Sequence, residues 1–112
     1  MAVFLGSEAA MKRWHSLDEK TKNERNKAGM ESWGRWVEKY KKSIIEVGAP
    51  LGKTMLVNSA GVSATKNALT AFTVVQAESH EAAAELFVDH PHFTLFPGES
   101  VEVMECLPIP GT

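Results

Sequence analysis

The stretch from Asp89 to Gly98 reads DHPHFTLFPG and brings together the residue types of this chain that are best suited to chemistry. His90 and His92 flank a proline and follow directly on Asp89. A free imidazole titrates near neutral pH, so it can act as an acid or a base with little tuning. We therefore expect His92 to serve as a general acid/base, with Asp89 or His90 orienting its ring.

A structural role competes with this catalytic one. In that interpretation His90 caps the preceding helix through its last carbonyl groups, or His92 packs under Phe93 and Phe96. Two histidines form a signal of low specificity, although loops that leave a helix for a strand commonly carry functional groups. The sequence leaves both alternatives open.

A metal site is a third interpretation of the same residues. In an extended segment His90 and His92 point to the same side, and Asp89 or Glu99 could add an oxygen ligand. A protein site needs three or four ligands, however, and no second cluster is visible in the sequence. We predict no metal. We also predict no cofactor. The sequence contains neither a glycine-rich phosphate loop nor a nucleophile elbow.

Trp33, Trp36 and Tyr40 recur at steps of three and four residues and therefore share one face of a helix. They could line a pocket for a flat apolar ligand, with the two tryptophans stacked on it. Aromatic residues at helical spacing more often belong to the core, which is the alternative interpretation. His80 follows a predicted helix cap and is expected to be exposed. Cys106 is expected on a strand, as a small hydrophobic residue.

The composition is that of an ordinary globular protein, and its 112 residues fit one domain that spans residues 1–112. The single cysteine excludes an intrachain disulfide, which is typical of a reducing cytoplasm. The first residues carry no charged segment ahead of an apolar run, so we expect no signal peptide. No segment approaches the ~20 apolar residues of a membrane span. We expect a cytoplasmic protein.

The net charge of −2 conceals an asymmetry between two parts of the chain. Residues 1–66 hold all 12 Lys and Arg residues and 7 acids, for a charge of +5. Residues 67–112 hold the other 7 acids and no Lys or Arg, for a charge of −7. The two parts are expected to pack together with complementary fields. A nucleic-acid surface is not predicted, because the basic part lacks the basic and aromatic patterning of the usual modules.

The first half of the chain predicts a short strand followed by helices. Residues 2–5 (AVFL) are apolar and end at a glycine, as in a brief strand. Ser16 to Glu19 (SLDE) has the pattern of a capping box, and the polar run from Asp18 to Lys27 is expected to be a solvated helix turn or a mobile loop. From Met30 to Val47 apolar residues recur at helical spacing, so we expect a long helix that Gly48 ends.

The second half predicts strands and one helix. Strands are expected at Lys53 to Asn58, Thr70 to Ala77 and Glu99 to Leu107. A helix should begin after Ser79 and stop near Val88 or Asp89, because a proline follows. This order predicts an α+β, ferredoxin-like β-α-β-β-α-β fold with a four-stranded antiparallel sheet and helices on one face. The other face must then be covered, and a second copy of the chain in a homodimer would cover it.

With these elements the chain resembles the YCII-related family of small dimeric α/β-barrel proteins. The resemblance rests on VFLGSEAA, on the Trp-rich helix ending in IIEVGAPLG, on AFTVVQAESHEAAAELFVDHP and on the closing SVEVMECLPIP. The subgroup with an HPH motif before the last strand is the most similar. The resemblance implies a homodimer with a cleft beside each sheet. Some members use a His–Asp pair in the first helical region; His15 is the only histidine there, and we do not assign it that role.

We therefore predict a protein that binds a small molecule, such as a small ring compound or a lactone, in a cleft between sheet and helices. If it is an enzyme, we expect lyase or isomerase chemistry with proton transfer by His92 and with Trp33, Trp36 and Tyr40 around the ligand. The alternative is a non-catalytic structural or interaction module that forms a homodimer. Neither nucleic acid nor membrane is an expected partner.

Overall fold

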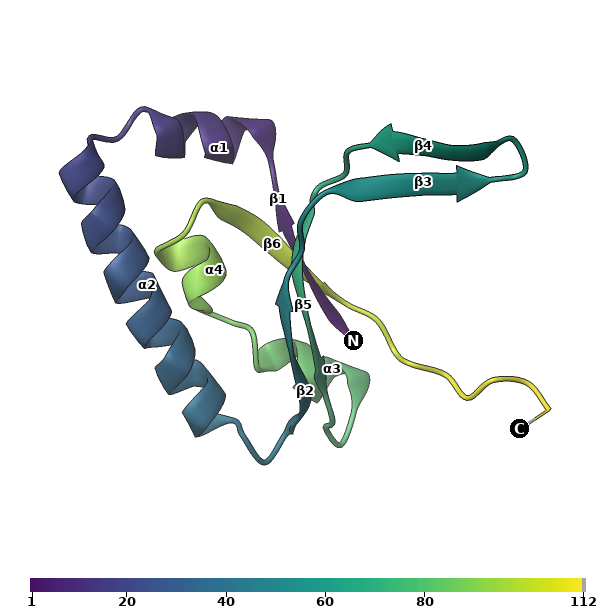
Figure 1. The fold of residues 1–112 in the computed structure, drawn as a ribbon. Coiled ribbons are helices and arrows are strands. Elements are labelled where there is room, and N and C mark those ends of the chain that lie inside the picture. Colours follow the sequence, from purple (N-terminus) through teal and green to yellow (C-terminus); the bar gives the residue numbers. More distant parts are fainter. Residues whose placement is uncertain (112) are drawn as a thin grey trace.

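The computed structural model describes residues 1–111, apart from the side chain of Thr94, and forms an α+β fold. Along the chain the elements are β1 (Ala2–Gly6), α1 (Glu8–His15), α2 (Glu19–Lys39), β2 (Ile44–Pro50), β3 (Thr54–Asn58), β4 (Gly61–Thr65), β5 (Leu69–Val75), α3 (His80–Glu85), α4 (Pro91–Thr94) and β6 (Gly98–Val103) (Figure 1).

The main sheet is antiparallel throughout and has the strand order β2-β5-β1-β6. Its two central strands are the first and the third of the four along the chain, which is consistent with a ferredoxin-like domain. Helices α2 and α4 lie against one face of this sheet (Figure 1). The predicted α+β fold with a four-stranded antiparallel sheet is therefore confirmed.

The core lies between the sheet and α2, with Phe4 at its centre. Alternation along β1 turns Ala2 and Phe4 toward the helices, and both side chains are fully buried. The Phe4 ring packs against Trp33 and Phe87, with centroids 5.1 Å and 5.8 Å away. Its partner on β5 is the small residue Ala71, which leaves space for these rings.

α2 starts earlier than the predicted long helix, because the polar run from Asp18 to Lys27 forms its cap and first half. Of the two alternatives predicted for this run, a solvated helix turn and a mobile loop, the solvated helix is the one that forms. The cap is Asp18, whose Oδ1 accepts a hydrogen bond from the Thr21 amide (3.3 Å). The predicted cap, Ser16, instead donates its hydroxyl to the carbonyl of Arg13 at the end of α1. A carboxylate adds a full negative charge at the positive end of the helix dipole.

The helix predicted from Met30 to Val47 is wrong in its last part. α2 ends before Tyr40, and both Ile44 and Val47 belong to β2. Ile44 continues the helical spacing after Tyr40 but pairs with Val75 in the sheet, so the spacing across the break is a coincidence. The β-branched residues of this segment favour a strand, and that preference prevails here.

The predicted strand from Lys53 to Asn58 exists as β3, but it lies in a separate hairpin with β4 and not in the main sheet. In the hairpin turn, the Asn58 side chain accepts a hydrogen bond from the Ala60 amide (2.9 Å). The hairpin and the C-terminal segment both project from the body of the molecule (Figure 1). The radius of gyration is consequently 16.1 Å, above the ~13 Å of a compact chain of similar length.

Gly48→Ala is expected to destabilise the fold by at least ~2 kcal/mol. Gly48 has a φ of 81°, a left-handed conformation, and an added Cβ would overlap the carbonyl oxygen of Phe72. Urea unfolding should show a lower midpoint for this variant. Gly34→Ala is the control: Gly34 is exposed on α2 with no neighbour within 4 Å, so alanine should raise stability by up to ~1 kcal/mol. A wild-type midpoint for Gly48→Ala would contradict the described path of β2.

Candidate functional site

The segment that carries the histidines forms a helix start. His90 is the N-cap of α4, and its Nδ1 accepts a hydrogen bond from the amide of His92 (3.0 Å). Pro91 occupies the first helical position, where its missing amide hydrogen costs nothing and its fixed φ suits the helix. The preceding helix already ends at Glu85. His90 therefore caps the following helix through an amide, and the predicted capping of the preceding helix is wrong.

His90 occupies the middle of an aromatic cluster and is 0% exposed. Its ring packs edge-on against Trp33 and Trp36, with centroids 4.4 Å and 4.7 Å away, and lies 5.0 Å from the ring of Phe4. Burial in this apolar setting, together with a smaller contribution from the nearby imidazole of His92, lowers the pKa of His90 from 6.5 to about 3. His90 is consequently neutral at physiological pH.

His92 is also buried, and it links α4 to the sheet. Its Nε2 lies 2.8 Å from the carbonyl oxygen of Leu5, so the ring donates this proton to β1. Burial lowers the pKa of His92, while the carbonyls of Leu5 and Ser100, which favour the protonated form, offset part of that effect. The ring also lies against Gly98, where an added Cβ would overlap it. His92 thereby holds the start of β6 and the end of β1 together.

The three aromatic residues predicted to bind a ligand lie in or beside the same cluster. Trp36 is buried, and its Nε1 donates a hydrogen bond to the carbonyl of Leu86 (2.8 Å). Tyr40 packs on Trp36 with a centroid distance of 5.5 Å, and the Nζ of Lys39 lies over the Tyr40 ring. Trp33 is half-buried. The structure therefore joins these residues to the histidines by core packing.

Asp89 stands apart from the cluster. It is exposed and has a φ of 62°, which reverses the chain just before the buried imidazole of His90. The role of His92 in proton transfer, with Asp89 or His90 orienting it, stays a prediction. Among residues 1–111, no group of three or more His, Cys, Asp and Glu side chains is arranged to hold a metal ion.

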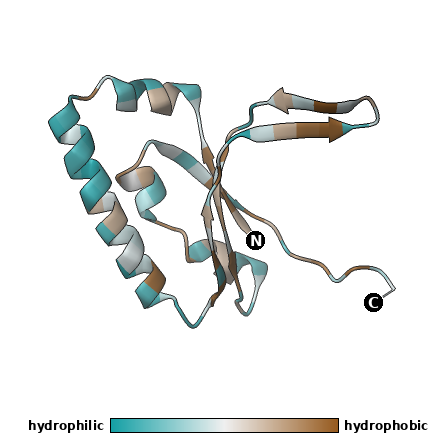
Figure 2. Cartoon of the chain, viewed as in Figure 1, coloured by the Kyte–Doolittle hydropathy of each residue, from teal (hydrophilic) through white to brown (hydrophobic). Residues whose placement is uncertain are grey.

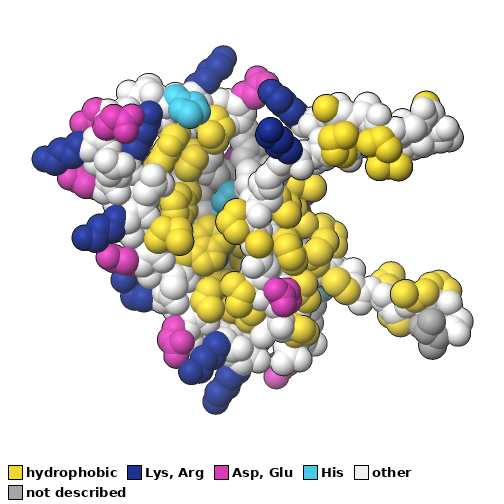
Figure 3. Space-filling view, viewed as in Figure 1, with side chains coloured by type: hydrophobic (Ala, Val, Ile, Leu, Met, Phe, Trp, Pro, Cys, Tyr) yellow, Lys and Arg dark blue, Asp and Glu magenta, His cyan; other side chains and the backbone are white. Residues whose placement is uncertain are grey.

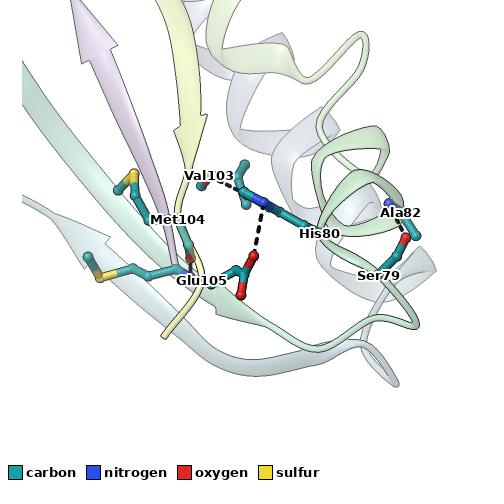
Figure 4. A network of polar contacts seen from close by, with 7 residues as sticks. Ser79, His80, Ala82, Val103, Met104 and Glu105 are labelled. Atoms are coloured by element: carbon teal, nitrogen blue, oxygen red, sulfur yellow. Dashed lines mark hydrogen bonds and ion pairs between the residues drawn. The ribbon is translucent and has the colours of Figure 1, made fainter. Parts of the chain in front are cut away.

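Two cavities lie outside the histidine cluster, and one of them contains His80. This cavity of about 360 Å³ lies between the start of α3 and the end of β6. His80 Nε2 is 2.7 Å from the carbonyl oxygen of Val103, and Nδ1 is 3.4 Å from Oε1 of Glu105 (Figure 4). The side chain is exposed as predicted, but it also joins α3 to β6. Sequence reasoning missed this contact because it spans more than twenty residues of chain.

The second cavity has a volume of about 430 Å³ and lies between α1, the first half of α2 and the corner that joins α4 to β6. Arg13 and Arg25 line it together with aromatic side chains. Sequence reasoning also missed this pair of arginines, which lie on different helices. The only available signal was their position on two successive basic segments. No helix in the described part of the chain is long and apolar enough to cross a membrane.

Acid is expected to destabilise the protein through His90. In the unfolded chain an imidazole takes up a proton near pH 6.5, whereas a pKa of about 3 keeps His90 neutral in the fold. Between these values the unfolded state binds one more proton. The contribution of His90 to stability is therefore complete above pH ~6.5 and falls by up to ~1.4 kcal/mol per pH unit as the pH is lowered toward 3. Urea unfolding from about pH 7 to about pH 4 measures this slope.

The variant His90→Asn separates the effect of His90 protonation on stability from the effect of its packing in the core. The asparagine Oδ1 can accept the His92 amide, as at many N-caps, but it does not titrate. The variant should be less stable at neutral pH by ~2 kcal/mol, because the smaller side chain leaves a cavity, yet it should lose stability less steeply in acid. His15→Asn, at an exposed position, should keep the wild-type slope. An unchanged slope for His90→Asn would contradict a neutral, buried His90.

Comparisons with known proteins found no match, so any function proposed for the chain must be argued from this geometry. No family model matches the chain, and no significant match was found among curated proteins or among solved structures. The likeness to the YCII-related family consequently stays a resemblance carried by the sequence segments quoted above. The fold itself is shown as an α+β domain with a four-stranded antiparallel sheet.

Proposed function

We propose that the chain is an interaction module that forms a homodimer through the open face of its main sheet. The observation that carries this proposal is a sheet face that no helix of the described chain covers, with half-buried Phe72 and Val74 in its middle and Glu46 and Glu102 on its edge strands. This face is set between two projecting segments (Figures 1 and 3). We call these segments the hairpin arm (residues 54–65) and the tail arm (residues 104–111). Pairing of two such sheets would produce the dimeric α/β barrel that the resemblance to the YCII-related family implies.

The open face is defined by the strand register. Val3 pairs with Phe72 on one side and with Glu102 on the other, so these three side chains share the face that points away from α2. Phe72 and its neighbour Val74 on that face are only half-buried. An apolar sheet face is stable only when another layer of structure covers it. A second copy of the sheet is a layer of matching size and chemistry.

Both arms expose apolar side chains to solvent in the single copy. On the hairpin arm they are Met55, Leu56, Val57 and Val62, and on the tail arm they are Met104, Leu107 and Ile109. The hydrophobic end of β3 and parts of the tail arm are visible in Figure 2. A single two-stranded hairpin is marginally stable in water at best. Packing against a second molecule would supply the burial that the hairpin arm lacks.

The charges favour a second copy of the same chain over another partner. The hairpin arm is flanked by Lys53 and Lys66, whereas the open face carries Glu102 and, paired with Val74, Glu46. In a two-fold symmetric dimer the same surface of each copy meets the other. A basic arm and an acidic sheet rim on one chain are then complementary in both directions.

Val57→Asp is expected to weaken the dimer at least tenfold. Val57 is 72% exposed on the hairpin arm, so the substitution costs the isolated chain little. In the dimer it would remove about 1.5 kcal/mol of apolar burial and place a carboxylate in the interface. Sedimentation equilibrium should give about twice the chain mass of 12.3 kDa for the wild type and a lower average mass for the variant.

Val88→Asp is the matched control, since Val88 is 65% exposed and lies beyond α3, away from both arms. It should have the same dissociation constant as the wild type. A monomeric wild type at the highest protein concentration tested would refute the proposal. Equal weakening by Val57→Asp and Val88→Asp would show that the hairpin arm is not the interface.

A further inference from the structure

The cavity between α1, α2 and the α4–β6 corner has the composition of a site for a flat anion. Its volume of about 430 Å³ falls in the range of small-molecule sites. Its apolar lining residues are Ala10, Trp14, Leu17, Phe93, Phe96 and Pro97, and polar groups make up the rest of the lining. Hydrophobic side chains gather between α2 and the sheet on the face of the molecule shown in Figure 3. Such walls bind a ring by exclusion of water and by stacking.

Among the described residues, the charged side chains that line this cavity are Arg13 from α1 and Arg25 from α2, and no carboxylate is among them. Within the described chain neither arginine takes part in an ion pair, whereas Lys22 on α2 pairs with Glu19 and Lys41, just beyond α2, pairs with Glu38. The remaining polar lining residue, Ser16, already donates its hydroxyl to the carbonyl of Arg13. Two unneutralised guanidinium groups beside an apolar floor favour an anionic occupant.

We propose that this cavity binds a small ring compound that carries a carboxylate. A guanidinium presents a planar fork of donors that matches a carboxylate, and the aromatic side chains beside it offer faces on which a ring can stack. The ring of the ligand lies among Trp14, Phe93 and Phe96, and the carboxylate lies between Arg13 and Arg25. This site lies on the helix layer and is independent of the open sheet face through which the chain dimerises.

Two contacts connect the cavity to the buried histidine cluster. Phe96 lines the cavity and packs edge-on against Trp33, with centroids 5.9 Å apart. Gly98 also lines the cavity and lies against the imidazole of His92. A ligand that presses on Phe96 therefore changes the surroundings of Trp33. Tryptophan fluorescence is consequently a second readout of binding, besides the heat of binding.

Benzoate and benzamide test the proposal, because they share size and shape but differ in charge. Titration calorimetry on the full chain should detect benzoate binding, with benzamide at least tenfold weaker. Arg25→Gln and Arg13→Gln should each weaken benzoate binding at least tenfold. Arg35→Gln is the matched control: Arg35 lies on α2, is exposed, bonds to Ser32 and is not part of the cavity lining, so this variant should bind benzoate like the wild type.

Several results would overturn the proposal. They are the absence of benzoate binding, equal affinity for benzamide, and equal weakening by Arg35→Gln and Arg25→Gln. Inorganic phosphate that displaces benzoate at equal concentration would overturn the requirement for a ring and show a general anion site. All substituted arginines are exposed, so circular dichroism melting should show unchanged folds. Sedimentation equilibrium on the same samples reports the dimer separately, so failure of one proposal is distinguishable from failure of the other.

Discussion

The burial of two neutral imidazoles is the constraint on which the arrangement of the helices depends. His90 starts α4 by accepting the amide of His92, and its ring fills the space between Phe4 on β1 and the tryptophans of α2. His92 donates to the carbonyl of Leu5, which attaches α4 to the sheet. A charged imidazole in this setting would lose its hydration on burial, which disfavours the protonated form. The lowered pKa values of both histidines therefore reflect the burial of the two rings between the first and the last third of the chain.

This arrangement divides the molecule into a closed side and an open side. The aromatic cluster packs against the sheet face that α2 covers. The apolar residues of the other face, including Phe72 and Val74, have no helix over them and can be buried only by another layer of structure. The basic part of the chain supplies α1, α2 and the hairpin arm, while the acidic part supplies β6 and its glutamates. The proposed association of two copies and the proposed binding of an anion would use opposite sides of the molecule.

Much of the sheet could be predicted from the sequence, because its strands are short, β-branched and bounded by turn residues. The Ser79 cap and the start of α3 are confirmed for the same local reason. The segment from Ile44 is predicted as helix because Ile44 follows Tyr40 by four residues, as the next residue on the same helix face would. The same spacing arises by chance when a strand begins there. The hairpin arm could not be separated from the main sheet, since strand partners are set by contacts distant in sequence. The burial of His90 also depends on contacts with residues distant in sequence. The HPH motif alone fits both a surface turn and a buried helix cap.

The charge of His90 in the folded protein tests this account most directly. Long-range nitrogen–proton NMR spectra report the protonation and the tautomer of each imidazole. The account predicts that His90 is neutral at about pH 5, well above its pKa of about 3, and that neutral His92 carries its proton on Nε2, facing the carbonyl of Leu5. A His90 ring that titrates near pH 6.5, as in an unfolded peptide, would place it in water and contradict the buried cluster.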